Sequence, residues 1–238
     1  MRTSEELEKS LEEKSELVSI SAHELRTSIS ALRWILQMLS SGDLGPVTDK
    51  QKDMLEKALL SSDRMKSVIS SLLAFNHADE SALSPVSSTA DFTRVINETV
   101  LEFGPQAQSK QMKIEAKTPA ALPPVACDPG LLRAVISILI ENAIKYGNPE
   151  STITASLSHT GKDITASIHD MGTIIPAEEH QVVFTKFFRS QSVKNETPGS
   201  GLGLYIAAYI VKRAHGTLSF ESTESAGTTF SVSIPAIA

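Results

Sequence analysis

Two long helical patterns fill residues 1–78, and the one proline and two glycines of this region all lie in one short segment, SGDLGPVTD. Apolar or small residues recur in both halves at alternating steps of four and three, which is the spacing of a helical bundle or coiled coil. The first pattern consists of Leu11, Val18, Ala22, Leu25, Ile29, Leu32, Leu36 and Leu39. The second consists of Met54, Ala58, Ser61, Met65, Val68, Leu72 and Phe75. We therefore predict an αα-hairpin.

The second helix has a recognisable start, because Thr48 followed by Gln51 is typical of a capping box. A single hairpin cannot cover two such stripes. Pairing with a second copy would bury both in a four-helix bundle. We therefore predict a homodimer formed through residues 1–78.

The sequence changes character after residue 78. Residues 79–88 are a predicted linker, and residues 89–238 mix helical patterns at 92–108, 129–146 and 204–214 with strand-like runs. The expected strands cover 112–116, 151–158, 163–169, 217–221 and 228–234. This mixture predicts an α+β fold with helices on one face of a sheet. The segment SQSVKNETPGSGLG is expected to be a mobile loop.

Composition excludes several classes of function. The net charge is −6, and no basic run occurs, so we expect no nucleic-acid partner and no membrane contact within this chain. The single cysteine, Cys127, excludes an internal disulfide and fits a reducing compartment. No apolar stretch approaches the roughly 18 residues of a membrane span. We expect a cytoplasmic chain, which could be the cytoplasmic part of a membrane-anchored sensor.

One histidine in the first helical pattern, His23 of SAHELRTSIS, points away from the apolar seam. At about 100° per residue it lies roughly 140° from the centre of the seam, whereas Thr27 lies about 40° from His23 on the same exposed face. A neutral imidazole keeps a lone pair that can attack phosphorus. Glu24 could orient the ring or take its proton. The alternative is an ordinary surface histidine beside a solvated glutamate.

Five segments, in order, resemble the motifs of two-component sensor histidine kinases. HELRTSISAL resembles the H-box, ILIENAIKYG the N-box, DMG the start of the G1 box, FTKFFR the F-box and GSGLGL the G2 box. The resemblance implies a dimerisation and histidine-phosphotransfer hairpin followed by an α/β-sandwich ATP-binding domain of the Bergerat (GHKL) type. It also implies ATP and Mg²⁺ as cofactors and a response-regulator receiver domain as partner.

The N-box segment offers groups that suit a nucleotide. Asn142, Lys145 and Tyr146 lie three and four residues apart, so they share one face of a helix. Asn142 has a carbonyl oxygen suited to Mg²⁺, and Lys145 has a cation suited to phosphate. The resemblance implies that Asn142 is the metal ligand and that Tyr146 lies beside the nucleotide. A polar stripe facing solvent is the alternative.

Asp170 ends the predicted strand ITASIHD and is followed by Met171 and Gly172. A carboxylate at this transition can accept a hydrogen bond from the amino group of adenine, which is the role that the resemblance implies. A turn-forming aspartate is the alternative.

The glycine-rich segment precedes a helix whose N-terminal end favours anions. Its glycines would allow the backbone to approach phosphate groups closely. The predicted nucleotide-binding residues here are Gly199, Gly201, Leu202 and Gly203. Arg189 is a weaker candidate for phosphate contact, and Phe184, Phe187 and Phe188 are expected to anchor the loop.

The sequence departs from the family pattern at two notable positions. Ser28 stands where the H-box usually has proline, so we expect a straighter helix. Ile174 stands where the G1 box usually has glycine. A β-branched residue there is expected to reshape the loop and weaken ATP binding.

The leading hypothesis is an ATP-dependent protein-histidine kinase that phosphorylates His23 and passes the phosphoryl group to a regulator aspartate. Thr27 resembles the position that holds the attacking water when such proteins dephosphorylate their regulator, so the enzyme could also be a phosphatase. A degenerate kinase that only docks a partner, and an ATPase or chaperone that shares the Bergerat fold, are the alternatives.

Overall fold

The computed structural model describes residues 4–80, 89–119, 121–191, 193 and 199–237, with side chains except at 4–20, 23, 60, 64, 66–68 and 70–80. The chain forms two compact units, residues 1–83 with 191–202 and residues 84–190 with 203–238. Because the positions of the units relative to one another are not determined, each unit is described by itself. Across the described part of the chain, every helix is too short or too polar to cross a lipid bilayer.

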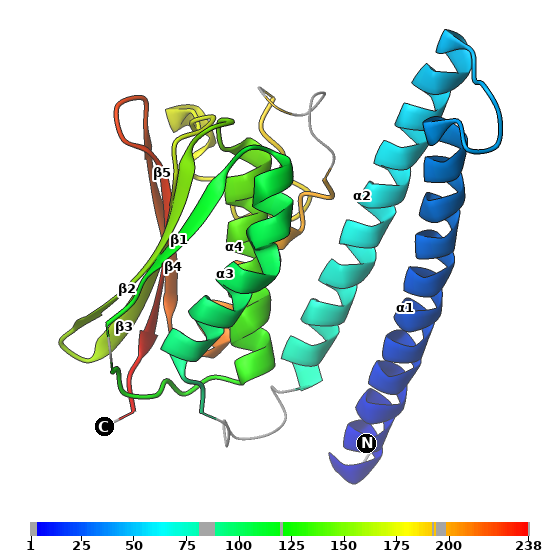
Figure 1. Ribbon diagram of the computed structural model, residues 1–238. Coiled ribbons are helices and arrows are strands. Elements are labelled where there is room, and N and C mark those ends of the chain that lie inside the picture. Colours follow the sequence, from blue (N-terminus) through cyan, green and yellow to red (C-terminus); the bar gives the residue numbers. More distant parts are fainter. Residues whose placement is uncertain (1–3, 81–88, 120, 192, 194–198, 238) are drawn as a thin grey trace. The chain divides into compact units, whose positions relative to one another are not determined.

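The first unit contains a helical hairpin, drawn in blue and cyan in Figure 1. Helix α1 covers Ser4–Ser41, and helix α2 covers Asp49–Glu80. Gly42 and Gly45 in the turn have φ angles of 84° and 118°, which glycine adopts without steric cost. The hairpin is therefore where the sequence predicts it.

The start of α2 is fixed by two reciprocal hydrogen bonds. The backbone N–H of Thr48 donates to Oε1 of Gln51 over 2.8 Å, and the backbone N–H of Gln51 donates to Oγ1 of Thr48 over 3.3 Å. Each bond satisfies an N–H group that has no partner within the helix. The predicted capping box is confirmed.

The two helices bury only part of the predicted apolar seam against each other. Ala22 and Ile29 of the predicted seam of α1 are buried together with Ile69 of α2, which was not in the predicted pattern. The prediction for α2 was wrong at Ser61, which is exposed, whereas its neighbour Ser62 is buried. Leu25 and Leu32, on the same seam of α1, keep 52% and 44% of their surface exposed. An apolar stripe of α1 therefore stays uncovered in a single copy of the hairpin. The predicted seam residues Leu11, Val18, Val68, Leu72 and Phe75 lie outside the described side chains.

The second unit is a sheet covered by helices. Its helices are α3 (Phe92–Ser109), α4 (Pro129–Tyr146), the short η1 (Ala177–Glu179) and α5 (Gly203–Arg213). Its strands are β1 (Lys113–Lys117), β2 (Thr152–Thr160), β3 (Asp163–Asp170), β4 (Thr217–Thr223) and β5 (Gly227–Pro235). Among the described residues the strand order is β1-β2-β3-β5-β4. β1 pairs with β2 in parallel, and the other pairs are antiparallel. The predicted α+β fold is confirmed.

One face of the sheet forms the core. Figure 1 shows α3 and α4 lying on the same side of the strands. Every second residue of β3, from Ile164 through Ala166 and Ile168, is buried on this side. The pattern follows from the two-residue period of a strand. Asp170 occupies the next position in the series, so a carboxylate ends a row of apolar side chains.

Polar side chains on the opposite face of the sheet bond across the strands. The hydroxyls of Ser167 and Ser231 lie 3.0 Å apart, and Nδ1 of His169 lies 3.0 Å from Oγ1 of Thr229. Cross-strand pairs of this kind stabilise a sheet modestly. This face needs no helix to cover it.

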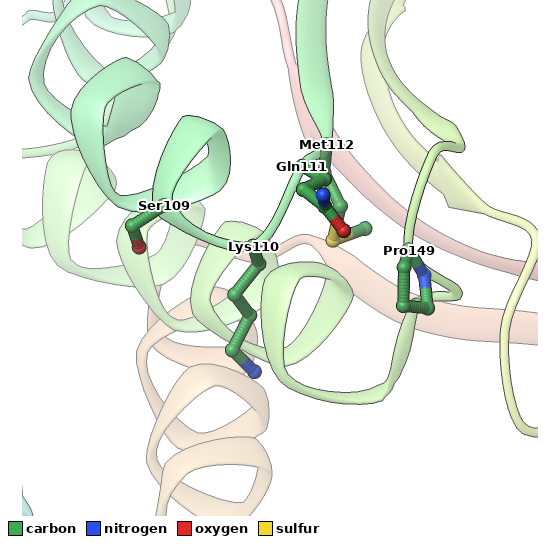
Figure 2. A pocket seen from close by; sticks show the side chains of 6 residues that line it. Ser109, Lys110, Gln111, Met112 and Pro149 are labelled. Atoms are coloured by element: carbon green, nitrogen blue, oxygen red, sulfur yellow. The ribbon is translucent and has the colours of Figure 1, made fainter.

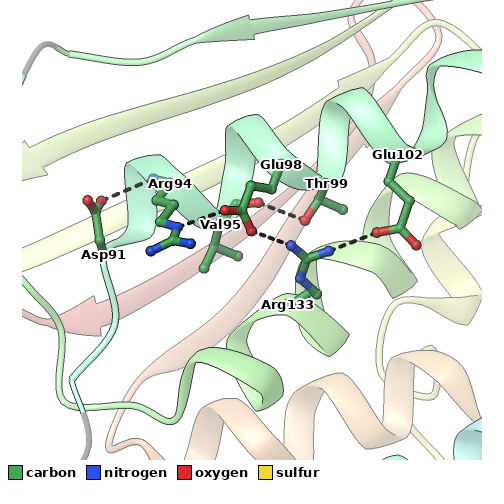
Figure 3. Close-up of polar contacts among 7 residues, drawn as sticks. All are labelled: Asp91, Arg94, Val95, Glu98, Thr99, Glu102 and Arg133. Atoms are coloured by element: carbon green, nitrogen blue, oxygen red, sulfur yellow. Dashed lines mark hydrogen bonds and ion pairs between the residues drawn. The ribbon is translucent and has the colours of Figure 1, made fainter.

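Arg133 joins α4 to α3 (Figure 3). Its guanidinium donates to Glu98 and to Glu102, the latter over 2.9 Å. Arg94 also donates to Glu98, over 2.7 Å, and Oδ1 of Asp91 accepts the backbone N–H of Arg94 at the start of α3. Hydrogen bonds from Arg94 and Arg133 lower the pKa of Glu98. The network joins α3 and α4, two of the helices that cover the sheet.

Candidate functional site

The H-box segment lies within α1, which continues without interruption through the position of the missing proline. Oγ of Ser28 donates to the backbone carbonyl of Glu24 over 3.0 Å, so the serine bonds back to the preceding turn. Glu24 and Thr27 are exposed, as predicted. His23 belongs to the same helical turn, but its side chain lies outside the described side chains.

Helix α4 carries the N-box residues on a face different from its core face. Oδ1 of Asp128 accepts the backbone N–H of Leu131 over 3.0 Å, and Pro129 occupies the first turn, so the helix start is well defined. The face toward the core buries Leu132, Val135, Ile136, Leu139, Ile140, Ala143 and Ile144. Asn142, Lys145 and Tyr146 are only half-buried.

Lys145 and Tyr146 contact each other at the end of α4. Nζ of Lys145 donates to the hydroxyl of Tyr146 over 2.9 Å and lies 4.7 Å from the centre of its ring. The tyrosine therefore restricts where the ammonium group can point. A cation held in this way suits an anionic ligand at the end of the helix.

Asp170 is a buried carboxylate of the second unit. Its side chain is 4% exposed, and its Oδ1 has no hydrogen-bond partner among the residues that the structure describes. Burial raises the pKa of this carboxyl to about 7, and the peptide group of Gly172 opposes the change only in part. A buried acceptor without a donor costs stability, which suggests that a ligand supplies the donor.

Gly172 joins the loop after Asp170 to the end of α4. A Cβ atom on Gly172 would lie 2.1 Å from the backbone oxygen of Tyr146 and 2.5 Å from Cα of Gly147. The backbone N–H of Thr173 donates to the same oxygen of Tyr146 over 2.9 Å. Only glycine allows this approach, which places the loop after Asp170 against the C-terminal end of α4.

Thr228 was not predicted as a site residue. It is 3% exposed and lies opposite Asp170 in the register of β3 and β5. Gly227, with φ 69°, packs on the same strand end, because a Cβ atom there would lie 2.2 Å from the backbone oxygen of Asp170. A signal was available in the sequence, because the two-residue period of the strand places the hydroxyl of Thr228 on the same face as Phe230 and Val232.

The glycine-rich segment fits its predicted backbone role in part. Gly201 has φ 71°, a conformation that L side chains rarely adopt. Gly203 begins α5, and a Cβ atom there would lie 3.2 Å from Cγ2 of Ile138, so the helix start packs closely on α4. Gly199, Gly201 and Leu202 belong to the first unit, and Gly203 belongs to the second. Residues 192 and 194–198 of the predicted mobile loop lie outside the described residues.

The F-box segment is anchored by only part of its aromatic set. The Phe184 ring meets the rings of Phe220 and Phe230 edge-on, with centroids 5.8 and 6.5 Å apart. Phe187 is 70% exposed and has φ 62°, so it does not anchor the segment as expected. Arg189 is half-buried.

A separate cavity of about 470 Å³ lies at the start of β1 (Figure 2). It is lined by Ser109, Lys110, Gln111, Met112, Gly147 and Pro149. Nζ of Lys110 donates to the backbone oxygen of Ile144 over 3.2 Å, at the C-terminal end of α4. Burial, and then the charge of Lys145, lower the pKa of Lys110. No predicted nucleotide-binding residue lines this cavity.

Two family models match the chain. Residues 13–81 match the His Kinase A (phospho-acceptor) domain, and residues 127–238 match the histidine kinase-, DNA gyrase B- and HSP90-like ATPase. The first match includes His23, and the second includes Asn142 and Asp170.

Known proteins are similar to nearly the whole chain. The adaptive-response sensory kinase SasA of Gloeothece citriformis (strain PCC 7424) is 29% identical over 236 residues, which are 97% of this chain and 60% of SasA. The solved structure of the Acinetobacter baumannii histidine kinase AdeS matches with a TM-score of 0.61 and 23% identity, over 91% of this chain and 98% of the chain in that structure. Full-length ShkA in complex with AMPPNP matches with a TM-score of 0.64 and 22% identity, over 94% of this chain and 46% of ShkA. The two structures support the fold, and the chain spans less than two thirds of the length of SasA.

Proposed function

Because this chain belongs to the two-component sensor histidine kinases, we propose that it transfers the γ-phosphoryl group of ATP to His23 and then to an aspartate of a response regulator. The observation that carries the proposal is the presence of both parts in one chain. A phospho-acceptor domain that includes His23 precedes an ATPase domain that includes Asp170.

Asp170 supports the assignment of the ligand. Its buried Oδ1 lacks a donor among the described residues, and the exocyclic amino group of adenine would supply one. Tyr146, whose backbone oxygen lies against Gly172, would lie beside the base. These contacts would bind the adenine end and leave the phosphates free to extend toward other groups.

The phosphates would be held by backbone and cationic groups. Lys145, half-buried at the end of α4, would contact phosphate oxygens, and Arg189 is the weaker candidate for the same role. The backbone of Gly199, Gly201, Leu202 and Gly203 would approach the phosphates at the N-terminal end of α5.

Asn142 fits a magnesium ion only together with the nucleotide. Among the described residues, no group of three His, Cys, Asp or Glu side chains could hold a metal by itself. Mg²⁺ is usually bound by one or two protein oxygens, phosphate oxygens and water. The amide oxygen of Asn142 would supply the protein ligand, and the bound ion would neutralise charge on the phosphates.

The transfer itself needs few protein groups. The lone pair of one His23 ring nitrogen attacks the γ-phosphorus, the P–N bond forms, and the bond from phosphorus to the bridging oxygen of ADP breaks. Glu24 is the adjacent residue that would orient the ring or take the proton from its other nitrogen. Thr27, exposed one turn later, would hold the attacking water when the regulator is dephosphorylated.

The hairpin supports a dimer. Leu25 and Leu32 of α1 and Met54 and Met65 of α2 keep 41–64% of their surface exposed in a single copy. Exposed apolar surface of this extent on a two-helix hairpin is best covered by a second hairpin. A homodimeric four-helix bundle would bury both stripes and present His23 to a receiver domain.

Labelled ATP tests the proposal directly. The full chain is incubated with γ-labelled ATP and Mg²⁺, and the label on the protein is treated with acid and with alkali. An acid-labile, alkali-stable label that His23→Gln removes supports the proposal. His215→Gln is the matched control and should keep the label. Nucleotide binding without any label would favour the docking or ATPase alternatives.

A further inference from the structure

Ile175 is held by side chains at both of its backbone polar groups. Its N–H donates to Oγ of Ser222 on β4 over 2.9 Å. Its carbonyl oxygen lies 3.0 Å from Nε2 of His180, and since a carbonyl can only accept, the ring nitrogen donates. The backbone at this point is thus fixed from two directions.

Ser222 also reaches the site of Asp170. Its Oγ lies 2.8 Å from Oγ1 of Thr228, the buried threonine that stands opposite Asp170 in the sheet. The hydroxyl of Ser222 therefore links the backbone of Ile175 to the strand beside the carboxylate. Ser222 is half-buried at the end of β4, and its hydroxyl accepts the backbone N–H of Ile175, which would otherwise need another hydrogen-bond acceptor.

Residues 170–175, which we name the Asp170 loop, contact the rest of the second unit at two further points. The backbone N–H of Thr173 donates to the oxygen of Tyr146 over 2.9 Å, and Gly227 packs against the backbone oxygen of Asp170. The loop is therefore attached to α4 near its middle, to β5 at its start and to β4 at its end. Of these attachments, only that to β4 depends on a side-chain hydroxyl.

Ile174, which stands where the G1 box usually has glycine, directly precedes Ile175 in the Asp170 loop. Ile174 is half-buried and is not among the described non-glycine residues with positive φ, so the loop here follows a path that does not need glycine. The next residue, Ile175, is held at both of its backbone polar groups, so its hydrogen bonds are among the contacts that fix this part of the loop.

We propose that Ser222 is a positioning residue for nucleotide binding, because its hydroxyl holds the Asp170 loop in the conformation that presents the carboxylate. The proposal rests on the proposed function, in that the ligand is ATP. Ser222 does not touch the nucleotide in this account and acts through Ile175 and Thr228.

Substitution of Ser222 tests the proposal in the full chain. Ser222→Ala removes the acceptor, Ser222→Thr keeps a hydroxyl, and Ser219→Ala changes an exposed serine of the same strand. Loss of one hydrogen bond to a backbone donor predicts that Ser222→Ala binds ATP about tenfold more weakly by calorimetry. The KM for ATP should rise by a similar factor while kcat at saturating ATP stays near that of the parent. Ser222→Thr and Ser219→Ala should stay within about twofold of the parent.

Amide hydrogen exchange supplies a readout that a general loss of stability would not give. In Ser222→Ala the Ile175 amide should exchange about tenfold faster, while the amides of β3 and β5 keep their protection. Unchanged ATP affinity in Ser222→Ala would overturn the proposal. Faster exchange throughout β3 and β5, or no rescue by threonine, would also overturn it. If the parent itself binds no ATP, the proposed function fails, and that outcome is separate because it does not depend on Ser222.

Discussion

Asp170→Asn should make the nucleotide-free second unit more stable at neutral and alkaline pH while it weakens nucleotide binding. Burial raises the pKa of the Asp170 carboxyl from an ordinary value near 3.8 to about 7. Between these two pH values the folded state keeps a proton that the unfolded chain releases. The parent therefore loses stability as the pH rises from 3.8 to about 7. Asparagine has a similar shape and does not ionise.

The magnitude follows from the two pKa values. The raised pKa of Asp170 lowers the free energy of unfolding of the parent by about 1.5 kcal/mol at pH 5 and by about 4 kcal/mol at pH 8. The effect vanishes well below pH 3.8. The amide of asparagine adds an offset of its own, but that offset does not vary with pH. The gain of Asp170→Asn over the parent should thus increase by about 2.5 kcal/mol between pH 5 and pH 8.

The assay can report on the second unit alone. All three tyrosines, Tyr146, Tyr205 and Tyr209, lie in that unit, whereas the single tryptophan, Trp34, lies in the hairpin. Urea unfolding followed by tyrosine fluorescence at several pH values gives the free energy of unfolding of the unit. ATP should stabilise the parent and have little effect on Asp170→Asn.

Asp163→Asn is the matched control, because Asp163 is exposed at the other end of the same strand. Its effect on stability should not change with pH. If the gain of Asp170→Asn is equally independent of pH, the carboxyl is not held in a desolvated site, and the reasoning is refuted. If ATP stabilises Asp170→Asn as strongly as the parent, Asp170 is not the adenine acceptor.

Three other substitutions separate the remaining roles. Asn142→Ala should abolish Mg²⁺-dependent phosphorylation. It should change the free energy of unfolding by less than about 1 kcal/mol, because the side chain is half-buried on the polar face of α4. Turnover equal to that of the parent would exclude Asn142 as a metal ligand. Gly172→Ala should destabilise the second unit by about 2–3 kcal/mol in urea unfolding, since the Cβ of the alanine would lie 2.1 Å from the backbone oxygen of Tyr146. An unchanged free energy of unfolding would mean that the loop does not approach α4 so closely. Thr27→Ala should leave phosphorylation of the protein intact and slow the dephosphorylation of its regulator; equal rates in a phosphatase assay would exclude Thr27 from that reaction.

Local sequence signals were sufficient for helices α1–α5 and strands β1–β5, but they did not predict the short η1. The steps of four and three predicted α1 and α2, and the pair Thr48 and Gln51 placed the start of α2, because capping depends on neighbours in the chain. The strand-like run that ends at Asp170 predicted β3. Each of these features involves residues only a few positions apart.

Contacts between distant segments were not predictable in the same way. The approach of Gly172 to Gly147 and the hydrogen bonds of Ser222 to Ile175 and Thr228 depend on which strands pair and in what register. A periodic pattern shows that a residue faces the core, but it does not show what lies opposite. For this reason candidate site residues could be named from the motifs, whereas the residues that position them could not.

The central claim is that His23 accepts the phosphoryl group. After incubation of the full chain with Mg²⁺ and ATP, proteolysis and mass spectrometry at neutral to alkaline pH should locate the phosphoryl group on the peptide that contains His23, with fragment ions that assign it to the imidazole. The same peptide from Asp170→Asn should carry much less. A phosphoryl group on another residue, or none on any peptide of a preparation that binds ATP, would contradict the account.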